Sequence, residues 1–415
     1  MDEISGSFYL MSRHRQGNMI LCSVEIDGMP DEGFLYRRLQ TIVDHHPKLQ
    51  YIPKEKKGML RSTFHWKRGI FNIEDHFICI EKNRFDKRNY RLCINKLLKT
   101  PLLSDKPEWV CHYITYKKSN KSFIVWKCHH TYGDGFLISE YLKKFADTSS
   151  IEYPKKIRPS VSLYKKIYSL VVTIISLLYF IFKYKKEDLP IDKDNADDDP
   201  ALFYHCKTWG LNEIKDLKNR YRVTVNDLLY TIIIKSLRKY CGKSINVSSL
   251  SIFNLRDYSK EEDMVNVDPN NVGFMIVTDK VGNEDMKELL KRSHEKFTDY
   301  KSSPITYILT QLLRYIYYIS PRAVVKILEF FGKKSTFGIS NFRTFSECNH
   351  INGCRVVNIS NMVIPYGVGM LFTIVSYDDK ITLNVTYRKR NLTSPKKFIE
   401  GLEDIYKELL ENTKI

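Results

Sequence analysis

Several familiar signatures are missing from this sequence, and each absence narrows the range of possible functions. The nine cysteines include no Cys-x-x-Cys pair and lie at irregular spacings. This usage indicates a reduced, cytosol-facing protein more than a disulfide framework. The opening residues, MDEISGSFYLMSRHRQGNM, contain no basic segment followed by a long apolar one, so we expect no secretory signal, and Asp2 argues against N-myristoylation.

Signatures of two large functional classes are also absent. No Gly-x-Ser-x-Gly sequence occurs, which argues against a Ser-His-Asp hydrolase of the usual strand-turn-helix type. The chain carries 66 Lys and Arg against 48 Asp and Glu, a net charge of +18. This excess favours an anionic partner, either a membrane surface or a co-substrate that carries phosphates. The lysines are scattered without zinc-finger spacing or basic-aromatic blocks, so we predict no nucleic-acid partner.

Length and composition predict a mixed α/β protein of two domains. A chain of 415 residues is too long for one ordinary core. Residues 183–200, KYKKEDLPIDKDNADDDP, have the charge runs and low apolar content of a solvated linker. We therefore predict an N-terminal domain over 1–150, an apolar helix with a charged linker over 151–200, and a C-terminal domain over 201–415.

Apolar periodicity predicts the elements of both halves. In the N-terminal half, residues 21–28 and 122–128 are predicted to be strands and residues 34–46 a helix. In the C-terminal half, residues 223–242 predict a buried helix that begins at Thr224 with a capping box and stops at Gly242. Three later apolar runs predict successive strands of one sheet, over 355–364, 370–377 and 380–387.

The most informative stretch is His-His-Thr-Tyr-Gly-Asp-Gly, residues 129–135, directly after a predicted strand. A helix is predicted to follow it, with Lys143 and Lys144 facing away from its apolar side. Successive strand side chains point to opposite faces, so His129 and His130 are expected to have different surroundings. One of them could act as a general base while the other supports it.

The other residues of the stretch suit a loop, and ordinary roles remain open for the histidines. Asp134 could cap the following helix or pair with an arginine, and Gly135 permits a close backbone approach. An isolated histidine is commonly a buried or surface residue without catalytic function. Metal binding is disfavoured, because the two histidines point apart and no second His, Cys or Glu cluster is present, so we predict no metal site.

The stretch resembles the HHxxxDG signature of the CoA-dependent acyltransferase and condensation-domain superfamily. The resemblance to bacterial-type wax ester synthase/diacylglycerol acyltransferases extends from about Ser7 to the C-terminus. The segments that carry it are PLLSDKPEW (101–109), VTVNDLLYTIIIKSLRKY (223–240), FNLRDY (253–258), PNNVGFMIV (269–277) and GISNFRTF (338–345). Two departures affect substrate preference: Glu108 stands where the family has Leu, and residues 342–345 replace its Val-Pro-Gly-Pro.

This resemblance implies two chloramphenicol-acetyltransferase-like domains with the active site in a tunnel between them. The resemblance further implies that His130 is the general base, that His129 supports it, and that Asp134 and Gly135 shape the loop. The family resemblance also assigns supporting positions to Trp109, Asn226, Asp227, Ser340 and Asn341. Acyl-CoA would be a co-substrate, and no bound cofactor is implied.

An uncharged run between the domains, residues 167–182, predicts contact with a membrane. It is shorter than the ~20 residues that a perpendicular span needs. A polar stripe at helical spacing makes it weakly amphipathic, which favours a helix lying in the membrane interface. The expected contact residues are Lys165, Lys166, Val171, Ile175, Leu178 and Lys183. A buried core helix is the competing interpretation, and a true span is disfavoured because it would separate the two halves of the active site.

Together these features predict a peripheral membrane O-acyltransferase that transfers a fatty acyl group from acyl-CoA to a long-chain alcohol or diacylglycerol. It would face the cytosol, at the endoplasmic reticulum or a lipid droplet if the source is eukaryotic. Two alternatives are a relative that transfers a short acyl group to another alcohol, and a non-catalytic lipid-binding protein with the same fold.

Overall fold

The computed structural model describes residues 3–12, 18–57, 62–102, 105–148, 162–185, 201–255, 270–344, 349–364 and 367–411 of the chain. These residues form two six-stranded sheets and one two-stranded sheet. Most of the predicted linker, from residue 186 to 200, lies outside the described residues.

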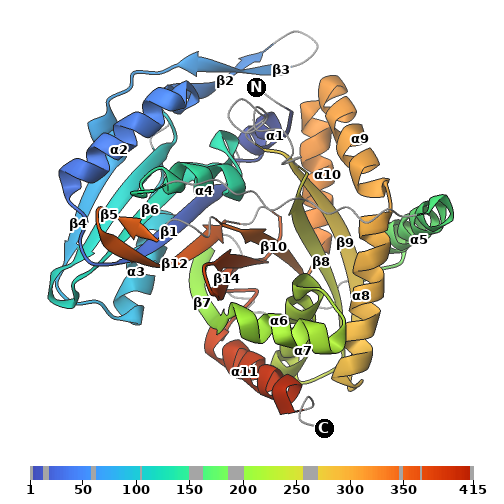
Figure 1. The fold of residues 1–415 in the computed structure, drawn as a ribbon. Coiled ribbons are helices and arrows are strands. Elements are labelled where there is room, and N and C mark those ends of the chain that lie inside the picture. The colour runs from blue at the N-terminus through green and yellow to red at the C-terminus, as the bar shows by residue number, and fades with distance from the viewer. Residues whose placement is uncertain are drawn as a thin grey trace.

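The first sheet has the strand order β11-β12-β1-β6-β5-β4 (Figure 1). Its strands are β1 (Met19–Asp27), β4 (Phe77–Lys82), β5 (Trp109–Tyr116), β6 (Lys121–His129), β11 (His350–Ile351) and β12 (Cys354–Val363). Helices α2 (Glu32–His45) and α4 (Gly135–Lys143) pack on one face, and α3 (Lys87–Lys99) covers the other. Trp126 belongs to the first of these two cores and Val125 to the second, so the side chains of β6 alternate between the faces.

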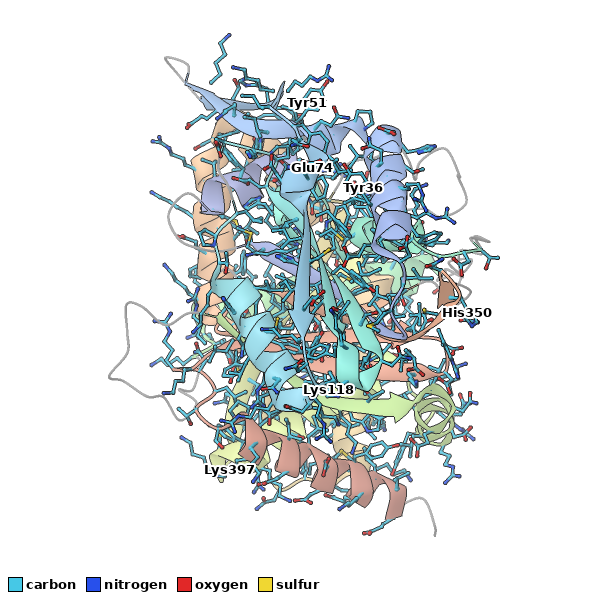
Figure 2. The ribbon with its side chains drawn as sticks, turned by 90° about the vertical axis from the view of Figure 1, so that its left-hand side faces the viewer. Tyr36, Tyr51, Glu74, Lys118, His350 and Lys397 are labelled. Atoms are coloured by element: carbon cyan, nitrogen blue, oxygen red, sulfur yellow. The ribbon has the colours of Figure 1, made fainter. Side chains whose placement is uncertain are left out.

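Figure 2 turns this side of the molecule toward the viewer, with Lys118 beside the turn between β5 and β6 and Lys397 on helix α11 below it. A hairpin of β2 (Tyr51–Lys57) and β3 (Ser62–Arg68) extends from the top of this half. Short 3-10 segments complete it: Pro47–Gln50, Ile73–His76, Lys117–Ser119 and His130–Tyr132.

The second sheet has the order β7-β14-β13-β10-β8-β9. Its strands are β7 (Ala201–Gly210), β8 (Ile245–Asn254), β9 (Val272–Val281), β10 (Phe337–Arg343), β13 (Met370–Tyr377) and β14 (Lys380–Arg388). One main core joins this sheet to α6 (Leu211–Tyr221), α7 (Val225–Cys241), α8 (Met286–Ser302) and α11 (Pro395–Glu411). Three further helices lie beyond β8 and β9, at the right of Figure 1: α5 (Leu163–Phe182), α9 (Ile305–Ile319) and α10 (Pro321–Lys334). Helix α1 (Glu3–Ser12) contacts α9 and α10.

The three C-terminal strands do not form one sheet, which corrects the prediction made from their periodicity. Strands β13 and β14 pair with each other in the second sheet, but β12 pairs antiparallel with β1 in the first. Ile359 and Met362 of β12 are fully buried there. Periodicity identifies a strand, but its partner depends on which sheet edge is available, and β1 supplies that edge. The two halves of the chain are therefore interlinked.

The predicted helix ends are present at two important positions. Thr224 and Asp227 form a capping box at the start of α7, and Gly242 ends the helix in the left-handed conformation. Asp134 caps α4 by accepting a hydrogen bond from the Leu137 backbone N–H at 3.1 Å. The predicted outward position of Lys143 is wrong, because its side chain is buried and lines a cavity. Helix α4 is covered on both sides, by the first sheet and by the walls of that cavity.

Candidate active site

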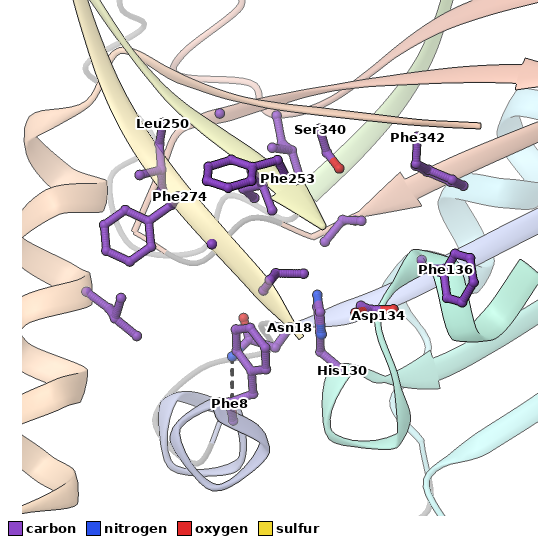
Figure 3. A pocket seen from close by; sticks show the side chains of 18 of the residues that line it. Phe8, Asn18, His130, Asp134, Phe136, Leu250, Phe253, Phe274, Ser340 and Phe342 are labelled. Carbon is purple, nitrogen blue, oxygen red and sulfur yellow. Dashed lines mark hydrogen bonds between the residues drawn. The ribbon is translucent and has the colours of Figure 1, made fainter. Parts of the chain in front are cut away.

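A cavity of about 400 Å³ lies between the two sheets and is lined by both halves of the chain (Figure 3). Its lining is mainly apolar. The first half contributes Phe8, Met11, Asn18, His130, Asp134 and Phe136, and the second half contributes Leu250, Phe274, Leu313, Phe331, Ser340 and Phe342. In Figure 3, Leu250 and Phe274 lie on one side of His130, and Phe136 and Phe342 on the other. The imidazole therefore stands between two apolar arms of one cavity.

His130 is placed by the end of β6 and the 3-10 turn that follows it. Its backbone N–H donates to the Asn18 carbonyl oxygen at 2.7 Å, and its ring packs on Phe8 with centroids 4.2 Å apart. His129 is the last residue of β6, so His130 has already left the strand. This departure turns the His130 ring into the cavity.

Asn270, the first described residue before β9, fixes the tautomer of His130. The Asn270 Nδ2 group donates to the His130 carbonyl oxygen at 2.8 Å and to Ser5 Oγ at 2.9 Å. A carbonyl oxygen only accepts hydrogen bonds, so the amide nitrogen must be on that side and Oδ1 must face the ring, 2.8 Å from Nδ1. Nδ1 therefore carries the proton, which leaves the lone pair on Nε2. This is the form that a general base requires.

The surroundings also keep this imidazole neutral. Burial lowers the pKa of His130 below its ordinary value of 6.5, while nearby Asp134 and the hydrogen bond to Asn270 act in the opposite direction. Removal from water disfavours the charged imidazolium, and this effect is the largest. The ring is consequently able to accept a proton at neutral pH.

His129 lies in different surroundings, as its position on the strand predicted. It is buried, and its Nδ1 lies 2.8 Å from Thr131 Oγ1 and accepts from the Thr131 backbone N–H at 3.2 Å. Burial, and then the neighbouring His130, lowers the pKa of His129 to about 3. Glu108 Oε2 is 3.9 Å from the same nitrogen. His129 is thus a neutral residue that holds the loop beneath His130.

Asp134 joins the loop of the first half to the second half. Its Oδ1 caps α4, and its Oδ2 accepts from the Asn271 backbone N–H at 3.3 Å. Asn271 directly follows Asn270, so a single carboxylate positions both sides of the His130 contact. Gly135 lies against the opposite wall, because a Cβ there would be 3.0 Å from Asn361 Nδ2 and 3.4 Å from the Phe342 ring.

The remaining predicted site residues divide into two groups. Ser340 and Asn341 of β10 line the cavity. Trp109 does not: it is buried in the first core, stacked on Trp126 with centroids 4.9 Å apart. Asn226 and Asp227 are also absent from the lining, and Asp227 is buried at the start of α7, 2.7 Å from His294 Nδ1.

The predicted membrane contacts lie on α5, which is exposed along one side. Ile175 is 60% exposed, Val171 49% and Leu178 48%. Lys165, Lys166 and Lys183 are exposed at its two ends. Within the described residues α5 is the one helix that is long and apolar enough to cross a membrane, and 17% of its apolar window is buried. The alternative of a buried core helix is therefore wrong.

Two important residues were not identified from the sequence. Asn270 lies in the quoted segment 269–277, but nothing in that segment indicates contact with a residue 140 positions away. Phe8 lies in a short helix without a motif, and only the fold brings it onto the His130 ring. In the described ranges, no cluster of three or more His, Cys, Asp or Glu side chains is arranged to hold a metal ion.

Comparison with known proteins agrees with this architecture. The model of the WS/DGAT C-terminal domain matches residues 269–410. Wax ester synthase/diacylglycerol acyltransferase 11 of Arabidopsis thaliana is 26% identical over an alignment of 237 positions that covers 49% of this chain and 47% of the relative. Its homologue 7 is 22% identical over an alignment of 458 positions that covers 93% of each protein. The chain thus matches about half the length of the first relative and nearly all of the second.

Solved structures match the whole chain. The wax ester synthase/diacylglycerol acyltransferase of Marinobacter aquaeolei VT8 superimposes with a TM-score of 0.65, at 15% identity and with 99% of each chain covered. This protein is a distant relative of the wax ester synthase/diacylglycerol acyltransferases. The first condensation domain of the calcium-dependent antibiotic synthetase gives a TM-score of 0.65 at 10% identity, covering 97% of this chain and 94% of the domain. The predicted chloramphenicol-acetyltransferase-like fold is confirmed.

Proposed function

We propose that this wax ester synthase/diacylglycerol acyltransferase relative transfers a fatty acyl group from acyl-CoA to a lipophilic alcohol, either a long-chain alcohol or diacylglycerol. The observation that carries the proposal is the His130 ring in a cavity between two sheets, with its Nδ1 proton fixed by Asn270 and its Nε2 free to act as a base. The apolar lining suits acyl chains on both substrates, and no bound cofactor is needed.

The chemistry follows from the position of Nε2. As the alcohol oxygen attacks the thioester carbonyl carbon, Nε2 removes the hydroxyl proton, and a tetrahedral intermediate forms. When this intermediate collapses, the C–S bond breaks and the imidazolium returns the proton to the CoA sulfur. A positioned base contributes about 10²–10⁴-fold, and the orientation of both substrates supplies much of the rest. His129 and Asp134 hold the loop and exchange no proton.

The setting of this reaction is also proposed. Both substrates carry long apolar chains, and α5 presents an exposed apolar face with lysines at its ends. A peripheral position on a cytosol-facing membrane or lipid-droplet surface would give the enzyme access to both.

The direct test combines labelled acyl-CoA with a panel of long-chain alcohols, monoacylglycerols and diacylglycerols. Wild-type protein should form an ester with at least one acceptor. His130→Ala should lower that rate by about 10²–10⁴-fold, with an unchanged melting curve and unchanged acyl-CoA binding. His129→Ala should weaken turnover without abolishing it.

A matched control is available on β7. His205 Nδ1 lies 3.1 Å from Asn384 Oδ1, a His-Asn pair that does not line the cavity. His205→Ala should leave the rate unchanged. A near-normal rate for His130→Ala would refute the mechanism. Acyl-CoA binding without turnover would favour a lipid-binding protein, and free CoA without an acceptor product would indicate hydrolysis.

A further inference from the structure

The polarity of α5 is reversed relative to an ordinary surface helix. The middle of its polar stripe faces the protein: Ser169 and Thr173 are buried, and Thr173 Oγ1 lies 2.8 Å from Ser303 Oγ at the end of α8. Its outward side is apolar or aromatic, and the exposed residues there are Tyr164, Ile167, Tyr168, Val171, Ile174, Ile175, Leu178, Tyr179 and Phe182. A helix of 20 residues is about 30 Å long, so this is a long apolar face.

Helix α9 presents a second face of the same kind beside it. Helices α5 and α9 are in contact at the edge of the molecule (Figure 1). The exposed residues of α9 include Tyr307, Ile308, Leu312, Tyr315 and Ile319. Isolated exposed apolar residues are common on protein surfaces, but two adjoining helix faces of this composition mark an interaction site.

Charge indicates the occupant of this surface. Neither α5 nor α9 contains an acidic residue. Exposed Lys165 and Lys166 lie at one end of α5, and Lys183 and Lys185 at the other. Apolar and aromatic side chains bordered by lysines fit the boundary between acyl chains and anionic headgroups, because cations near such a surface are attracted to it.

The surface adjoins the cavity. The inner side of α9 contributes Leu313 and Tyr317 to the cavity wall, while its outer side is exposed. Phe274 lines this cavity and also a small gap between α5 and α9 that is bounded by Leu177 and Leu309. Phe274 of β9 therefore borders both the seam between the two helices and the space that contains His130.

We propose that the outward faces of α5 and α9 together dock on an anionic lipid bilayer, and that the seam between them, bordered by Phe274, is the route by which the lipid substrate enters. The entry route rests on the function proposed above, whereas the docking surface does not. In this orientation a lipid chain passes from the bilayer into the cavity without crossing water.

Vesicle flotation tests the docking surface without any need for turnover. The wild-type chain is mixed with vesicles of phosphatidylcholine alone, or of equal parts phosphatidylcholine and phosphatidylserine. It should float with the second and detach as salt is raised. Combined Val171→Ser, Ile175→Ser and Leu178→Ser on α5, or Ile308→Ser, Leu312→Ser and Tyr315→Ser on α9, should each weaken binding by about tenfold or more.

A control set with similar chemistry lies in the other half of the chain. Ile70 is 85% exposed, Leu92 55% and Ile78 42%. Changing these three to Ser should leave flotation unchanged, and melting curves should show that all variants are folded. If a variant does not fold, Ile175→Trp replaces it: tryptophan emission should be quenched by brominated lipid, and Leu92→Trp should not be. Unquenched Ile175→Trp would contradict docking.

Other outcomes would overturn the proposal in distinct ways. Unchanged flotation of the α5 variant excludes the surface, and a loss confined to the α5 variant excludes α9 from it. A dimer in lipid-free buffer that the same substitutions dissociate, with vesicle binding intact, would show that a second copy covers this face.

The entry route has its own measurement. Leu309→Trp, in the seam but outside the cavity lining, should narrow the seam and lower kcat/KM at least tenfold for a long-chain alcohol in vesicles, while a short soluble alcohol reacts normally. Equal effects on both acceptors would refute the route. His130→Ala should float like the wild type, because docking does not depend on turnover. If the wild-type protein floated but formed no ester with any acceptor, the proposed function would be refuted and the docking surface would remain.

Discussion

The fold has largely removed the Glu108 carboxyl group from water, close to His129. The Glu108 side chain is 19% exposed, and Oε2 has no hydrogen-bond partner among the described residues. Burial raises the pKa of Glu108 to about 7, and Lys54 opposes this only partly. In the family that the sequence resembles, Leu stands at this position.

The raised pKa of Glu108 predicts a measurable pH effect on stability. Between its ordinary value of 4.5 and about 7, the unfolded chain is ionised while the folded chain holds the proton. Folding stability is therefore lost as pH rises through this window. Glu108→Gln should remove the loss, so that from pH 5 to pH 8 the variant gains on the order of 1–3 kcal/mol relative to wild type. Urea unfolding at each pH measures the difference.

Comparison with wild type at each pH cancels the contribution of titratable groups far from Glu108. The control is Glu81→Gln, because Glu81 is 61% exposed in its ion pair with Lys117. Its stability difference should vary little over the same range. Parallel curves for Glu108→Gln and wild type would show that the carboxyl group is already ionised in the folded state.

At the scale of elements, two similar helix caps have different relations to the site. Asp134 caps α4 and also holds Asn271 at the start of β9. Thr224 caps α7 through the Asp227 backbone N–H at 3.3 Å, away from the cavity lining. Both caps satisfy helix N–H groups, but only the Asp134 cap orients the loop that carries His130.

Removing either cap should lower stability, and only one removal should lower activity. Asp134→Ala and Thr224→Ala are each expected to cost about 0.5–2 kcal/mol. Asp134→Ala should also reduce kcat about tenfold or more, because 1.4 kcal/mol of lost positioning corresponds to a factor of ten. Thr224→Ala should retain the wild-type kcat. Thermal melting and ester formation are measured for both.

Asn is also a good cap, so Asp134→Asn separates capping from charge. It should restore most of the stability. If Thr224→Ala reduced kcat as strongly as Asp134→Ala, the effect would come from general loosening of the fold.

At the scale of the whole molecule, β12 completes a sheet whose other long strands come from the first half. It covers the edge of β1 and buries Ile359 and Met362. Asp147, near the end of the first half, lies beside the turn between β11 and β12. Its N–H donates to the His350 carbonyl oxygen at 3.0 Å, and its Oδ1 accepts from Asn352 N–H at 2.7 Å. The first sheet therefore contains strands from both sides of the predicted boundary between residues 150 and 200.

This arrangement predicts that residues 1–148 alone aggregate, because the β1 edge is open and apolar. Fusion of residues 349–364 after residue 148 through a short glycine-serine linker should increase soluble, folded protein, since the two ends are already adjacent. A fusion with the same residues in scrambled order is the control. Solubility and far-UV circular dichroism are compared. A soluble, folded 1–148 fragment would show that β12 is dispensable.

The sequence by itself determined much of the local structure and the family resemblance. Alternating and helical apolar patterns predicted strand β6 and the capped, buried helix α7, because these depend on neighbours in the chain. The order of His129, His130 and Asp134 between a strand and a helix identified the loop. The spacing of motifs along most of the chain then identified the fold, which the superposition confirms.

The tertiary structure decided what depends on distant residues. The tautomer of His130 is set by Asn270, the partner of β12 by the edge of β1, and the outward face of α5 by the Ser303 hydroxyl just after α8. Each is a contact between segments far apart in the chain. Periodicity shows that one face of a helix is apolar, but it does not show what that face contacts. The reversed polarity of α5 therefore follows only from the tertiary structure, in which Ser169 and Thr173 face the protein.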